Sequence, residues 1–74
     1  MQKYKITLYY DIHTPWSGKT SYNLKKEKII QSDNFPSDET VYEEAQLMLK
    51  ELQLMFIMHD IYNGGFTVEQ IDYE

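Results

Sequence analysis

The sequence contains no cysteine and no arginine, and only two prolines and three glycines among its 74 residues. Without cysteine, neither disulfide bonds nor a thiolate-held zinc ion can stabilise the fold. No apolar run approaches the ~18 to 20 residues that a membrane-spanning helix needs. The N-terminus leads directly into alternating sequence, so we expect no signal peptide and no contact with a membrane.

The composition is nevertheless that of a folded chain. Apolar residues make up 42% of the sequence and aromatic residues 15%, with seven tyrosines. A chain of 8.9 kDa has room for one hydrophobic core, and it buries only roughly 60% of the surface that its unfolded form exposes. We therefore expect a single domain over residues 1–74 with a thin margin of stability.

Two strands are predicted in the first part of the chain. Residues 3–12 alternate between apolar and polar side chains, which is the pattern of a half-buried strand. Residues 13–19 contain Pro15 and Gly18 and are expected to form a turn. A second strand over 20–30 completes a hairpin spanning 3–30. Its alternation slips by one residue near the middle, which predicts a bulge or a bend.

A helix and a third strand are predicted in the rest of the chain. Pro36 marks a loop, and Ser37 or Asp38 can cap a helix that we expect over 38–62. Asn63-Gly64-Gly65 is a typical stop signal, because glycine and asparagine adopt the left-handed conformation cheaply. Residues 66–73 then read as a strand.

These elements predict an α+β fold with the order β-β-α-β. If the first strand is central, the other two strands flank it and the helix connects them across one face of a three-stranded, antiparallel-type sheet. One long helix packed on one face makes a single small two-layer domain. The opposite sheet face stays uncovered, with Tyr9 on it.

The predicted helix carries two apolar stripes. A helical projection places one broad stripe toward the sheet as core; it comprises Val41, Ala45, Met48, Leu52, Met55 and His59, with Leu49 and Phe56 at its edge. A second stripe lies on another side and comprises Leu47, Leu54, Met58 and Ile61. Three explanations stay open: the apolar face wraps partway into the sheet, the 31–37 loop covers the second stripe, or the stripe meets another chain, for which a homodimer is the simplest partner.

No catalytic, cofactor or metal site is recognisable. Ser17-Gly18-Lys19-Thr20 matches the end of a phosphate-binding loop, but His13 stands where its first glycine should be. His13 and His59 are the only histidines, and neither has a ligand partner at a suitable spacing. We expect no enzymatic activity, no cofactor and no bound metal.

Charge is divided unevenly along the chain, whose net charge is −5. Through Lys28 there are six lysines and two acids, a balance of +4, and from Ile29 onward there is one lysine and ten acids, a balance of −9. The net charge and the absence of arginine argue against nucleic-acid binding. Lys25, Lys26 and Lys28 beside tyrosines keep a weak nucleic-acid binder as an alternative.

Two further sets of residues are candidates for binding a protein partner. Acidic residues can meet a basic surface, because complementary potentials speed encounter and select partners; they are Glu39, Glu43, Glu44, Glu51, Glu69 and Asp72. Aromatic residues of the hairpin can serve as anchors, namely Tyr9, Trp16 and Tyr22. Trp16 either folds back on the edge of the core or projects from the turn.

In size, acidity and lack of catalytic motifs, the whole chain resembles the small phage-encoded proteins that block host defence or DNA-handling enzymes, including the anti-CRISPR type. The resemblance rests on no motif. It implies a non-catalytic inhibitor or modulator whose partner is a nuclease or host defence complex, in the cytoplasm of the host cell. The alternative is a homodimeric assembly subunit that uses the second helix stripe and inhibits nothing.

Overall fold

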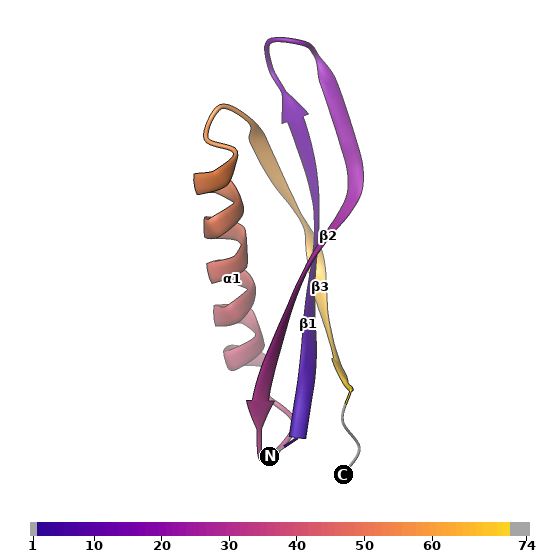
Figure 1. Ribbon diagram of the computed structural model, residues 1–74, viewed down its shortest axis with the longest axis vertical. Coiled ribbons are helices and arrows are strands. Elements are labelled where there is room, and N and C mark those ends of the chain that lie inside the picture. The colour runs from indigo at the N-terminus through magenta and orange to yellow at the C-terminus, as the bar shows by residue number, and fades with distance from the viewer. Residues whose placement is uncertain (1, 72–74) are drawn as a thin grey trace.

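The structure is a computed structural model in which residues 2–71 are described. It contains β1 (Gln2–Thr14), β2 (Lys19–Ser32), α1 (Asp38–Met55) and β3 (Asp60–Gln70). Figure 1 shows a narrow molecule in which α1 runs alongside the sheet and the β1–β2 hairpin extends beyond the end of the helix. The molecule measures 48 × 17 × 17 Å along its principal axes. The predicted α+β, β-β-α-β domain is confirmed.

The central position of β1 is also confirmed. The strand order is β2-β1-β3, and β1 pairs antiparallel with both neighbours. Both outer strands therefore run in the same direction, and α1 connects them. Within residues 2–71, no helix covers the face of β1 that carries Lys5, Thr7 and Tyr9, as expected.

The core lies where the alternating pattern of β1 meets the helix. Tyr4, Ile6 and Leu8 are almost fully buried on the helix side of the sheet. From the helix the core receives Val41, Ala45, Met48 and Leu52. Burying each large apolar side chain contributes about 1.5 to 3 kcal/mol, so this small cluster is the main stabilising element of the fold. From Tyr9 onward β1 is only half-buried, because its outer part extends past the helix.

The start of α1 follows the capping chemistry of the sequence. Ser37 adopts an extended conformation, and its hydroxyl oxygen accepts a hydrogen bond from the backbone N–H of Thr40 at 3.2 Å. Asp38 and Glu39 occupy the first turn, where negative charge opposes the positive end of the helix dipole. Of the two predicted caps, Ser37 is the one used. Before it, the Phe35 ring packs edge-on against Tyr4 at 5.2 Å, so this loop covers the core at the helix start and not the second stripe.

The predicted end of the helix at residue 62 is wrong. Helix α1 ends at Met55, Phe56 serves as its C-cap, and a short turn leads into β3 at Asp60 instead of at residue 66. The physical reason is the length of β1, which continues to Thr14. Residues 60–63 pair with its outer part, with Asp60 opposite His13 and Ile61 opposite Ile12. Long-range strand pairing thus overrides local helix propensity.

Both outer strands contain a bulge beside the same stretch of β1. In β2 the register shifts around Tyr22 and Asn23, so the expected bulge exists but precedes the lysine-rich stretch. Asn23 has a positive φ of 58°, and its N–H donates to the Asp11 carboxylate at 3.0 Å. In β3 the register shifts at Gly64 and Gly65. The predicted helix stop is therefore a strand bulge.

The bulge in β3 requires its glycines. Gly65 has a φ of 107°, which side chains disfavour, and its N–H donates to the side-chain oxygen of Asn63 at 2.8 Å. A Cβ atom on Gly64 would lie 3.2 Å from the carbonyl oxygen of Tyr9. Glycine is the residue that fits both a positive φ and a close approach of two backbones.

Candidate interaction surface

Side chains of α1 form ion pairs with side chains of β2. Lys26 and Lys28 project from β2 on the helix side, opposite Leu8 and Ile6 of β1. Lys28 pairs with Glu44, and the Lys26 ammonium lies 3.5 Å from the Glu51 carboxylate. Two of the predicted partner-binding acids are thus neutralised by lysines of the same chain.

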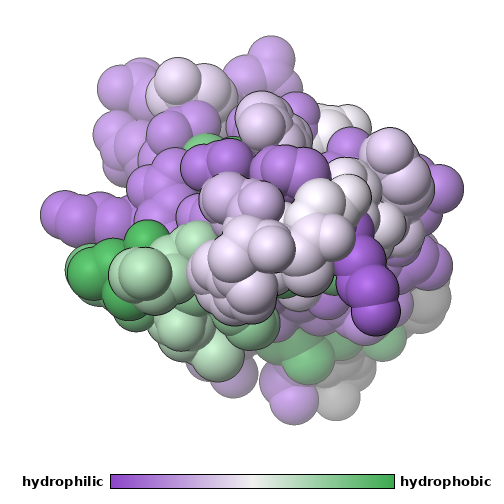
Figure 2. Space-filling model, turned by 90° about the horizontal axis from the view of Figure 1, so that it is seen from above, coloured by the Kyte–Doolittle hydropathy of each residue, from purple (hydrophilic) through white to green (hydrophobic). Residues whose placement is uncertain are grey.

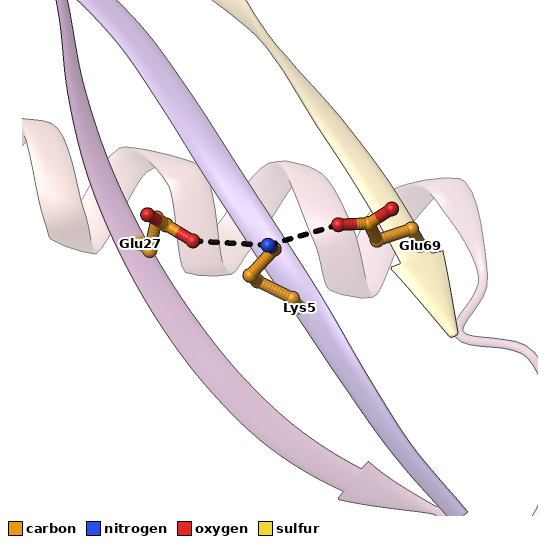
Figure 3. Close-up of polar contacts among 3 residues, drawn as sticks. All are labelled: Lys5, Glu27 and Glu69. Atoms are coloured by element: carbon orange, nitrogen blue, oxygen red, sulfur yellow. Dashed lines mark ion pairs between the residues drawn. The ribbon is translucent and has the colours of Figure 1, made fainter. Parts of the chain in front are cut away.

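Glu69 lies on the opposite side of the sheet. Figure 3 shows the Lys5 ammonium on β1 between Glu27 of β2 and Glu69 of β3, at 3.2 and 2.9 Å. The bonds to Glu69 and Glu27 raise the pKa of Lys5 above the ordinary lysine value of 10.5. This ion-pair ladder ties all three strands together across the uncovered face.

The predicted acidic surface is therefore divided. Glu39 and Glu43 are exposed on α1 and have no ion pair within residues 2–71. Glu44 and Glu51 face β2, Glu69 faces the other side of the sheet, and Asp72 lies outside the described residues. The fold does not gather these carboxylates into one patch.

The lysines considered for nucleic-acid binding are divided as well. Lys25 lies on the uncovered face with its ammonium 5.8 Å from the centre of the Tyr9 ring. Lys26 and Lys28 point to the other face and pair with helix acids. A phosphate backbone would need these charges on one side, so the arrangement does not favour the nucleic-acid alternative.

The three aromatic candidates do not form one rim. Tyr9 is half-buried on the uncovered face, and Tyr22 is 69% exposed at the β2 bulge. Trp16, in the hairpin turn, is 65% exposed, and its ring packs edge-on against His59 at 4.8 Å. His59 in turn contacts Phe56 at 5.5 Å. Trp16 thus contacts the segment after α1 while most of its surface stays accessible.

The second helix stripe does not exist as predicted, because α1 is shorter than expected. Leu47 and Leu54 lie on the exposed side of α1, with 51% and 67% of their surface accessible. Met58 belongs to the turn after the helix, and Ile61 belongs to β3, where it packs against the core. Assigning Met55 to the core stripe was also wrong, since it is 68% exposed.

An apolar cluster at the end of α1 takes the place of that stripe. We call it the end patch; it comprises Leu54, Met55, Ile57 and Met58, whose exposed fractions are 67 to 78%. Figure 2, which views the molecule from this end, shows apolar side chains gathered on one side with polar residues around them. From Leu52 to His59 the chain has no charged residue. That uncharged run was the sequence signal for the patch.

A second apolar feature lies at the other end of the helix. A groove of about 500 Å³ separates the first turns of α1 from β3, and we call it the β3 groove. Its walls include Val41 and Tyr42 from the helix and Phe66 and Val68 from the strand. The rings of Tyr42 and Phe66 lie edge to face at 6.4 Å. Asp38 and Glu39 border it on the helix side.

Within residues 2–71, no group of three or more histidine or acidic side chains could hold a metal ion. No helix in that range is long and apolar enough to cross a membrane. No family model, curated protein or solved structure matches the chain.

Proposed function

We propose that this chain is a small, non-catalytic protein-binding module, and that the end patch together with Trp16 is its binding surface. The observation that carries the proposal is the exposure of four large apolar side chains in an uncharged stretch of a chain with so small a core. Small monomers seldom expose such a contiguous patch. Methionine adapts to irregular partner surfaces, and tryptophan is over-represented among residues that dominate binding energy.

The activity that this surface supports best is inhibition or modulation of a partner by covering part of it. The proposal keeps a nuclease or another nucleic-acid-handling defence complex as the partner class, because the net charge of −5 would attract a basic protein. It does not rely on imitation of nucleic acid, since Glu44, Glu51 and Glu69 are paired internally. Apolar contact supplies the affinity, and charge assists the encounter.

Site-specific photocrosslinking in the natural host tests the binding surface. A photoreactive residue at Ile57 should yield a discrete adduct with one protein, and Met58→Glu in the same chain should abolish it. The matched control is the same label at Asn34, which is exposed in the loop before α1. Equal adducts from both positions, or none from Ile57, would contradict the proposal. The partner's activity with and without the purified chain then separates an inhibitor from an assembly subunit.

A homodimeric subunit is the second candidate, and the exposed side of α1 supports it. Leu47 and Leu54 are seven residues apart and therefore lie on one side of the helix, where both are exposed. Light scattering over a tenfold range of concentration should then give a mass near twice 8.9 kDa. Leu54→Glu should return the mass to that of one chain. A single-chain mass at all concentrations would eliminate this candidate.

A further inference from the structure

The two edges of the sheet differ in the charge that they present. The β2 edge carries Lys25, Lys26, Glu27 and Lys28 in consecutive positions, and charged edge strands resist pairing with other chains. In β3 the eight residues from Ile61 to Val68 carry no charge. Only the Gly64–Gly65 bulge interrupts this strand, which leaves its final part regular. The β3 edge is thus the unprotected edge of the sheet.

The register shows which backbone groups this edge offers. The N–H of Ile71 donates to the carbonyl oxygen of Lys3 at 3.0 Å, so this residue directs its hydrogen-bonding groups toward β1. In an antiparallel pair such residues alternate with residues that point their N–H and C=O away. Thr67 and Glu69 therefore bond toward β1, whereas Phe66 and Val68 direct their backbone groups toward the open edge.

The same two residues place their side chains in the β3 groove. Phe66 stands opposite Leu8, and Val68 stands opposite Ile6, both on the helix side of the sheet. Tyr42 forms the facing wall. An added strand would therefore find hydrogen-bonding groups and an apolar recess side by side.

The charge next to the recess is negative. Asp38 and Glu39 are exposed on the groove's helix side, and neither has an ion pair within residues 2–71. A second copy of this chain is a poor occupant, because pairing two β3 strands would bring the Asp38 and Glu39 pairs of both copies together. The only charges of β3 itself are Asp60 and Glu69. An occupant with lysine or arginine would relieve this charge.

We propose that the β3 edge binds an extended peptide segment of a partner protein, which adds a fourth strand to the sheet. Phe66 and Val68 supply the backbone hydrogen bonds, and an aliphatic side chain of the segment fills the β3 groove. A lysine or arginine two positions away, on the same face of the added strand, faces Asp38 and Glu39. This is the strand-addition mode of peptide recognition. The proposal does not depend on the end patch, which lies at the other end of α1.

The test uses synthetic probes and the full chain. The probe is a short, end-blocked peptide in which valine and lysine alternate along one face of the strand and threonine occupies the positions between them. Its binding is followed by amide NMR spectroscopy and hydrogen exchange. We expect shifts and slowed exchange at the amides of Phe66 and Val68. The same peptide with glutamate in place of lysine controls for charge, and a probe N-methylated on one edge controls for backbone pairing. Both controls should bind at least about tenfold more weakly, since each loses charge pairs or main-chain bonds.

A variant localises the charge effect. Asp38→Asn combined with Glu39→Gln should weaken the lysine probe about threefold to tenfold at low salt, in the range expected for two exposed charge pairs. Glu43→Gln, which removes another unpaired acid of the same helix, should leave its affinity unchanged.

Three results would overturn the proposal. Equal affinity of the N-methylated or the glutamate peptide would exclude strand addition at an acidic edge. Shifts centred on Glu27 and the uncovered face would place the probe elsewhere. Protection of Phe66 and Val68 that grows with protein concentration and without any probe would identify a second copy as the occupant.

Discussion

Helix α1 rests on the sheet along two flanks that are built differently. Toward β3, the contact is apolar and includes Tyr42 against Phe66. Toward β2, Glu44 and Glu51 of the helix pair with lysines of the strand. Ion-paired side chains remain stable when they are exposed to water. Exposed apolar side chains, in contrast, lower the free energy when a further group buries them. The β3 groove accordingly lies along the apolar flank.

The largest effect should come from the buried centre that both flanks share. Met48→Ala should lower the free energy of unfolding by about 2 to 5 kcal/mol, because it removes a buried side chain and leaves a cavity. Urea unfolding measures the change. The matched control is Leu47→Ala on the exposed side, with an expected change within about 0.5 kcal/mol. A large cost at Leu47 would mean that this side is buried in an assembly.

A mutation in the β3 bulge, on the apolar flank, should have the next largest effect on the free energy of unfolding. Gly65→Ala should cost about 1 to 3 kcal/mol, because its φ of 107° is strained for a residue with a side chain. Among the described residues, no atom beyond Gly65 and its two chain neighbours lies within 4 Å of the added methyl group, so the cost is one of backbone conformation. Thermal unfolding beside Thr67→Ala, an exposed position in the same strand, checks this. Equal melting temperatures would show that the bulge is not held in this conformation.

Mutations of the ion pairs on the flank toward β2 should change the free energy of unfolding less. A double-mutant cycle with Lys28→Met and Glu44→Gln should give a coupling of about 1 kcal/mol at low salt, and the same cycle at Lys26 and Glu51 about 0.2 to 0.5 kcal/mol. Glu44 is the stronger partner because its side chain is 25% exposed, against 60% for Glu51, and the paired oxygen is buried. Added salt should reduce the weaker coupling more. Equal couplings would contradict this ranking.

The smallest effect concerns Lys5 on the uncovered face, and it disappears in alkaline solution. Because its pKa is higher in the folded chain than the ordinary value of 10.5, its contribution is complete below that value and is lost as the pH rises through the folded pKa. The melting temperatures of the wild type and of Lys5→Met should therefore converge at high pH. A difference that stays constant would contradict the ion-pair ladder of Figure 3.

Local pattern predicted most of the fold. The alternation of β1 and the cap at Ser37 follow from neighbouring residues, and the structure contains both. The end of α1 could not be predicted in the same way, because no residue between Leu52 and Met58 breaks a helix. It is set by the need of the outer part of β1 for a partner strand, which is a long-range requirement.

The candidate surface was harder to predict for the same reason. Projection along an over-long helix placed Met58 and Ile61 on one stripe, whereas the chain turns between them. The number of acidic residues does not reveal their partners. Lys5 pairs with Glu69, Lys26 with Glu51 and Lys28 with Glu44. Such pairs depend on register and on which flank of the helix meets which strand.

The two bulges also restrict the register in which the outer strands can pair with β1. Both flank the same stretch of β1, and each is closed by a side chain, Asp11 for β2 and Asn63 for β3. If β3 slid by two residues along β1, its apolar side chains would still face the helix, so hydrophobicity alone would not reject the error. The slip would, however, carry the Gly64–Gly65 bulge away from Tyr9, where the lack of a side chain on Gly64 permits the close approach of the two backbones. The bulges thus give a short, repetitive pattern of alternating residues one correct alignment.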